Sequence, residues 1–267
     1  MKKNISDYFG AIGNWFSAWE FIFKNKLAHY FLYPLILTIL LSMGAIVLIK
    51  EAVSYVMPFI TPHIQYESVD GSFGEVAKAV ASNVAAYATA FVLFLASWYI
   101  FSRVQKYIIL AVMSPIMSLL SDRTEEILTG NKTPFKLGQF VLDVFRGVVI
   151  AIRNLFMEFL LSFVFWVGCV YLSLSIPVLA IILTPFTMII AFLISAYYFG
   201  FSTFDFSLER RKSGVRDSIK IIRSNKASVL GNGTMFLLCF MIPYVGVTCG
   251  TIVSTVAAML TIHEKKI

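Results

Sequence analysis

The side chains of this sequence that are placed to do chemistry are mostly cations beside long apolar segments. Some precede the first such segment, and the others lie between later ones. Cations and backbone N–H groups next to an interrupted helix can hold a small anion within a membrane protein. Basic residues at helix ends also set topology and contact lipid head groups, so both interpretations stay open. The candidate binding residues are Lys24, Lys26, His29, Arg103, Arg123, Glu125 and Arg153.

Other kinds of chemistry find little support in the sequence. The three cysteines form no CxxC pair, and the three histidines stand far apart without an HExxH pattern, so we expect no metal and no cofactor. No GxxxxGK[ST] loop marks an ATP-driven pump, and no GxSxG motif marks a hydrolase. The long uncharged segments hold no carboxylate, because Glu158 and Asp205 only border one. We therefore expect a passive conduit and not an enzyme.

The composition predicts that the solvent of this chain is a lipid bilayer. Of its 267 residues, 58% are hydrophobic and 14% are charged, and the chain holds 25 Phe, 12 Tyr and 4 Trp. A soluble domain carries roughly twice this charged fraction. A soluble globule of this length has no room to bury so much apolar surface, which excludes disorder, a disulfide-rich secreted scaffold and an ordinary cytosolic enzyme.

Uncharged segments divide the chain into crossings and hairpins. Tyr30–Ile49 has 20 residues and Ala79–Ser102 has 24, so each is long enough to cross about 30 Å of hydrocarbon. Phe159–Phe204 has 46 residues and Ala227–Ile262 has 36, so we expect each to fold back as a helical hairpin. Tyr107–Ser121 has only 15, which predicts a partial dip or an interfacial segment.

The tips of both hairpins are apolar. Pro177 and Pro185 bracket the first tip, and the second contains Pro243 and Gly246. Apolar tips favour hairpins that stop inside the membrane, where broken backbone must pack in protein or line a wet cavity. The alternative is a full crossing with a tight turn. Gly246 and Gly250 begin a ladder of small residues that permits close helix packing, most simply within the chain.

Two further features concern helix ends. Apolar residues spaced by three and four over residues 5–23 predict an amphipathic helix, either at the membrane interface or packed against the protein. The Thr129–Gly130 step predicts the end of a helix, and Pro134 suits the first residue of the next one.

The charges are distributed unequally between the two sides that this layout defines. The loop between the first two crossings holds 2 basic and 4 acidic residues, and the remaining segments hold 20 basic and 11 acidic ones. Basic residues concentrate on the cytoplasmic side, so we expect both termini to be cytoplasmic in a multi-pass protein of the cell inner membrane. The net charge of +7 then reports orientation and not nucleic-acid binding.

Two blocks of sequence resemble the CysZ-like family, which carries the etoposide-induced-protein-like domain. The first is Ser114–Gly130, with its Ser-Pro step, leucine pair, Glu125 and closing Leu-Thr-Gly. The second comprises an aspartate-led turn at Asp205, a helix that ends in basic residues, a glycine and an apolar hairpin with an Ile-Pro tip. Its residues are Asp205–Lys212, Ile222–Lys226, Gly233 and Ile242–Pro243.

The resemblance implies an all-α inner-membrane protein with two long crossings and partly penetrating hairpins, in a homo-oligomer. Characterised bacterial members are sulfate permeases, in which a G-(L/I)-R motif before the first crossing is tied to sulfate binding. The matching stretch here is Lys26–His29, which lacks both the glycine and the arginine. The family proline after the second tip is replaced by Thr251.

The leading functional hypothesis is a permease or channel for a small, sulfate-like anion. The alternative is a non-transport membrane protein, such as a lipid-binding, assembly or stress-related factor. The chain is expected to form one membrane domain over 1–267. Its parts are an amphipathic helix at 1–26, two transmembrane helices at 27–106, an inner-face segment at 107–158, hairpins at 159–204 and 227–262, and a basic helix at 205–226.

Overall fold

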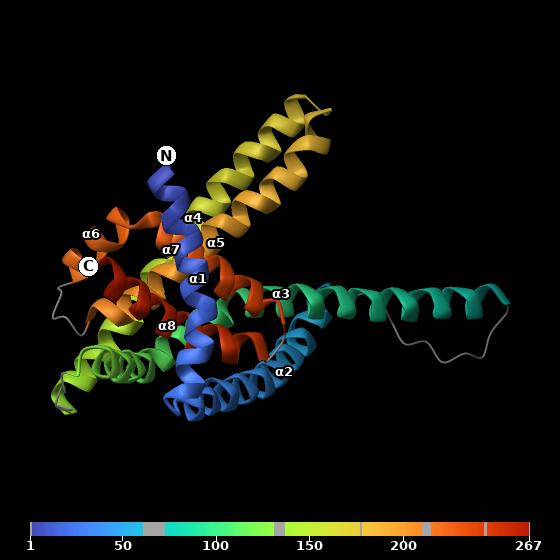
Figure 1. The fold of residues 1–267 in the computed structure, drawn as a ribbon. Coiled ribbons are helices and arrows are strands. Elements are labelled where there is room, and N and C mark those ends of the chain that lie inside the picture. The colour runs from blue at the N-terminus through green and yellow to red at the C-terminus, as the bar shows by residue number, and fades with distance from the viewer. Residues whose placement is uncertain are drawn as a thin grey trace. The chain divides into compact units, whose positions relative to one another are not determined.

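The computed structural model describes residues 2–60, 73–130, 137–176, 178–209, 215–242 and 245–266. Every element in these ranges is helical, which confirms an all-α fold (Figure 1). The elements are α1 (Lys2–Lys24), the 3-10 helix η1 (Ala28–Phe31), α2 (Leu32–Ile60), α3 (Phe73–Thr129), α4 (Leu137–Ser175), α5 (Leu179–Glu209), α6 (Val215–Ser224), α7 (Lys226–Phe240) and α8 (Val245–Lys265).

Four helical segments in the described residues are long and apolar enough to cross a membrane. They are Ala28–Val56, Phe145–Ser175, Leu179–Leu208 and Val245–Lys265. Large apolar side chains are exposed along the two middle segments, including Phe163 on α4 and Ile181 on α5. The chain is a multi-pass membrane protein whose exposed apolar side chains contact the bilayer.

The helices form two compact units. One contains Met1–Thr38 with Tyr107–Ile267, and the other contains Ile39–Lys106. In the second unit the buried Gln105 side chain donates a hydrogen bond of 3.5 Å to Ser42. The described part of the predicted crossing Ala79–Ser102 includes the apolar stretch Tyr87–Trp98, and its passage through the membrane stays a prediction.

The predicted short segment Tyr107–Ser121 is not a separate element. It continues α3, which runs unbroken for 57 residues and contains Pro115. The helix ends at Thr129 as expected, since Gly130 adopts a φ of +75° and donates its backbone N–H to the Glu126 carbonyl oxygen at 2.8 Å. Pro134 lies outside the described residues.

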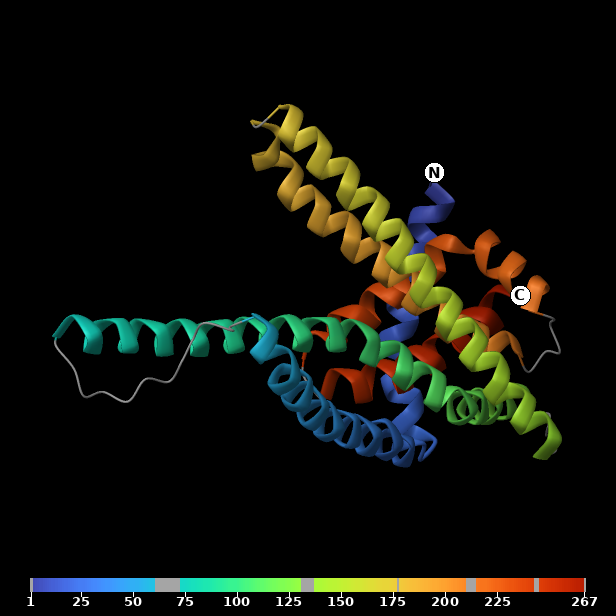
Figure 2. The ribbon, with the colours of Figure 1, turned by 180° about the vertical axis from the view of Figure 1, so that it is seen from behind.

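The first hairpin is formed by α4 and α5, which run side by side (Figures 1 and 2). Its turn falls between Ser175 and Leu179, so the expectation that Pro185 marks the tip is wrong. Pro185 lies inside α5, near its start, and removes one backbone N–H donor from the helix. Pro177 lies outside the described residues. Apolar spans of 31 and 30 residues allow both helices a full crossing.

The second hairpin is formed by α7 and α8. At 15 residues, α7 is about 22 Å long, which is less than the hydrocarbon thickness. Most of α8 is buried in the protein although the helix is apolar enough to span a membrane. Pro243 lies outside the described residues, whereas Gly246 packs against the carbonyl group of Cys239 at the end of α7. This hairpin therefore forms part of the protein core.

The amphipathic helix α1 packs on both helices of the second hairpin. The buried Trp15 donates its indole N–H to Ser254 Oγ on α8 at 3.2 Å. The other face exposes Phe9, Phe16 and Phe23, each about 60% accessible. One face of α1 therefore packs against the protein, as one of the two predictions had it. The other face is aromatic and exposed, and it is available to the membrane interface.

The crossing of α5 and α7 depends on two glycines. A Cβ atom at Gly233 would lie 1.7 Å from the Ala196 carbonyl oxygen, and one at Gly200 would lie 1.9 Å from that of Val229. Gly250, by contrast, makes ordinary contacts with α7. The buried Asn232 side chain then reaches Thr203 on α5 at 2.9 Å and the Ser254 carbonyl oxygen on α8 at 3.0 Å.

We expect Gly233→Ala to destabilise the protein, because its methyl group cannot fit unless α5 and α7 separate. Overpacking of this kind typically costs about 1–3 kcal/mol and sometimes more. The measurement is thermal unfolding of the purified protein in detergent. Gly168→Ala is the matched control, since a Cβ there meets nothing within 4 Å. Equal stability of the two variants would contradict the close crossing.

Candidate functional site

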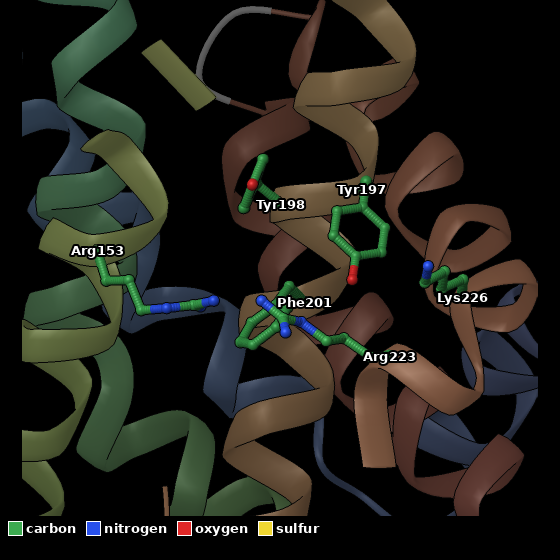
Figure 3. Close-up of a pocket in the computed structure, with 6 residues that line it drawn as sticks. All are labelled: Arg153, Tyr197, Tyr198, Phe201, Arg223 and Lys226. Carbon is green, nitrogen blue, oxygen red and sulfur yellow. The ribbon is translucent and has the colours of Figure 1, made fainter. Parts of the chain in front are cut away.

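A basic pocket lies among α4, α5 and the α6–α7 corner, with a volume of about 320 Å³ (Figure 3). Arg153 comes from α4, while Tyr197, Tyr198 and Phe201 come from α5. Arg223 lies in the last turn of α6, and Lys226 is the first residue of α7. Three of the six lining residues are cations and none is acidic. The pocket therefore has the charge and the donors to bind an anion.

The Arg153 guanidinium is held in place from two sides. It lies 4.9 Å from the centre of the Phe201 ring and donates a hydrogen bond of 3.0 Å to Asn154 Oδ1. Asn154 is fully buried, and its amide donates to Ser202 Oγ at 3.0 Å. A planar, positioned guanidinium retains free N–H donors for a ligand. Figure 3 shows Arg153 and Arg223 extending toward each other across the Phe201 ring.

The corner between α6 and α7 brings the other two cations together. Asn225 separates the helices, and both its backbone N–H and its side-chain amide donate to the Ile221 carbonyl oxygen. This ends α6 and starts α7 within one residue. Arg223 and Lys226 consequently flank a single sharp corner and are both exposed at the pocket. Tyr197 and Tyr198 can add phenol O–H donors beside them.

Asp205 lies near this site and stabilises the packing of the surrounding helices. It is 1% exposed and accepts a hydrogen bond from Arg146 on α4 at 3.0 Å, and Arg146 also donates to Ser218 on α6 at 2.7 Å. The resemblance placed Asp205 at a turn, which is wrong, because α5 continues to Glu209. The ion pair instead joins three helices and fixes α6, which carries Arg223.

Glu158 lies inside the apolar span that begins at Phe145, not at its border as expected, because α4 starts well before the uncharged run. It is 6% exposed and accepts hydrogen bonds from Tyr107 on α3 and from Ser195 on α5. Tyr107 also stacks on Phe199 of α5. A buried carboxylate at this depth is stabilised by such donors, so these contacts tie α3 to the hairpin.

The structure separates the predicted binding residues into two groups. Arg153 lines the pocket, whereas Lys24, Lys26 and His29 lie around the end of α1 and η1. Lys26 adopts a left-handed φ of 59°, and its carbonyl oxygen lies 3.2 Å from the His29 ring.

Arg123 belongs with the second group. It pairs with Glu126 at 2.5 Å and lies within electrostatic range of Tyr30 in η1. Glu125 is half-buried near the end of α3. The side chain of Arg103 lies outside the described residues.

Five of the six residues that line the pocket were missed as candidates: Tyr197, Tyr198, Phe201, Arg223 and Lys226. The spacing of three between Arg223 and Lys226, at the end of a strongly amphipathic segment, was a signal for the two cations. The tyrosine pair carried no comparable signal, because aromatic residues occur throughout the apolar segments.

The family described as "Sulfate transporter CysZ/Etoposide-induced protein 2.4" matches residues 14–249. The chain belongs to this family. The match includes every residue that lines the basic pocket and the cations at the end of α1. A comparison with curated proteins gives no match.

We expect Asp205→Ala to destabilise the protein strongly, because Arg146, which is only 14% exposed, would be left without its carboxylate. Removing one partner of a buried ion pair typically costs about 3–5 kcal/mol. Thermal unfolding in detergent measures the loss. Arg146→Leu/Asp205→Leu is the control and should unfold closer to the wild type, since it removes both charges. If the double variant is at least as unstable as Asp205→Ala, the ion pair does not join the helices in this way.

Proposed function

We propose that this protein is a permease for a small inorganic anion, sulfate-like, and that the basic pocket binds the anion during passive or gradient-driven uptake. The observation that carries the proposal is the convergence of Arg153, Arg223 and Lys226 from three helices without an acidic residue in the lining. The family description, which names a sulfate transporter, supports the same substrate class.

The chemistry of the pocket suits a tetrahedral oxyanion. Charge-assisted hydrogen bonds from guanidinium and ammonium groups are among the strongest that a protein offers to such an anion. Arg153 is already oriented by Phe201 and Asn154, so little side-chain freedom is lost when it binds. The exposed Lys24, Lys26 and His29 form a second cationic region, which we assign to the entrance of the path.

The remaining functional assignments follow from the sequence. The distribution of basic residues supports an inner-membrane location with both termini in the cytoplasm. We further propose that the protein acts as a homo-oligomer and has no enzymatic activity. Transport by diffusion through such a path needs no ATP site.

Uptake of labelled sulfate into liposomes that contain the purified protein tests this function. We expect Arg153→Gln to raise the sulfate concentration at half-maximal uptake by about tenfold, because one charge-assisted hydrogen bond is lost. Lys50→Gln removes the same charge from an exposed position outside the pocket and should not change it. No flux above empty liposomes would refute transport, and an unchanged Arg153→Gln would refute the role of the pocket.

A further inference from the structure

An exposed apolar strip on α4 leads away from the basic pocket. Val149 and Phe156 lie one helical turn on either side of Arg153 and therefore flank the side of α4 from which it projects. They are 57% and 60% exposed, and the strip continues through Ile152 and Phe163. Only 11% of the most apolar stretch of this span is buried in the protein. In a bilayer, the α4 apolar strip (Val149, Ile152, Phe156 and Phe163) contacts lipid, from head-group depth beside Arg153 to the acyl chains around Phe163.

The opposite border of the pocket is basic. Arg216, Lys220 and Arg223 recur at intervals of four and three on α6 and are all exposed. The other side of this helix is anchored in the protein by the buried Ser218 and Ile222. A short amphipathic helix with a basic outer face is typical of the surface of an anionic membrane. The pocket therefore lies where an apolar surface meets a basic one.

The contents of the pocket fit the same depth. Tyr197 and Tyr198 combine an apolar ring with a polar tip, which favours the head-group region of a membrane. The volume of about 320 Å³ corresponds to about ten water molecules, which is more than one tetrahedral ion with four oxygens requires. The additional space can hold the glycerol part of a head group.

We propose that the pocket binds the phosphate group of an anionic phospholipid. Arg153, Arg223 and Lys226 hold the phosphate oxygens, while the acyl chains lie along the α4 apolar strip. The same phosphate-binding chemistry serves a free oxyanion, so lipid and transported anion compete for these cations. The site itself depends on the pocket and its apolar border, and it exists whether or not the protein transports sulfate.

Native mass spectrometry of the full chain in detergent, with added phosphatidylglycerol or phosphatidylcholine, tests the proposal. We expect retention of phosphatidylglycerol in preference to phosphatidylcholine, and a loss of its affinity by roughly thirtyfold in Arg223→Gln/Lys226→Gln. Lys3→Gln/Lys50→Gln removes two exposed charges outside the pocket and should bind lipid normally. Arg223→Lys/Lys226→Arg keeps both charges and should retain most of the binding. This last variant separates loss of charge from loss of fold.

Competition with free sulfate identifies the source of the bound anion. Displacement of phosphatidylglycerol by millimolar sulfate, with no effect of the same concentration of sodium chloride, supports a shared pocket. Equal binding of the two lipids, or equal binding by the wild type and Arg223→Gln/Lys226→Gln, would overturn the lipid site. Sulfate flux that persists in that case leaves the proposed transport intact. Lipid binding without any flux refutes transport and leaves the lipid site standing.

Discussion

Close packing of helices at glycine residues, joined by hydrogen bonds between buried polar side chains, is the interaction on which the rest of the structure depends. Lipid is as apolar as leucine, so helices whose outer faces contact a bilayer gain little from hydrophobic burial against one another. Gly200 and Gly233 instead let the backbones of α5 and α7 touch. Asn232 and Ser254 then connect α5, α7, α8 and α1 through hydrogen bonds. Close backbone contacts and hydrogen bonds therefore hold the helices of the core together.

This packing positions the basic pocket. The α5–α7 crossing sets Tyr197 and Phe201 beside the start of α7, where Lys226 lies. The Arg146–Asp205 pair, with Ser218, holds α6 against α4 and α5. The pocket cations come from three helices that these contacts hold in place, and the mutual repulsion of the cations favours an anion between them.

The sequence predicted the features that follow from composition and local chemistry. The lengths of the uncharged segments predicted the helical hairpins, and Gly130 predicted the end of α3. Each of these features depends on a short stretch of chain. The position of Pro185 inside α5 could not be predicted, since a proline near a helix start and one at a turn look alike in sequence. Of the three cations in the pocket, only Arg153 was predicted as a binding residue. Arg153 stood out beside an apolar run, whereas its meeting with Arg223 depends on how distant helices pack.

We infer that the α4 apolar strip lies in lipid and ends at the basic pocket at head-group depth. Spin labels at Ile152 and Phe163, in liposomes and with the three native cysteines replaced by alanine, test it by electron paramagnetic resonance. The expected result is that oxygen relaxes the Phe163 label strongly while a water-soluble nickel complex does not, and that the Ile152 label is reached by both. Equal access of the nickel complex to both positions would contradict the claim.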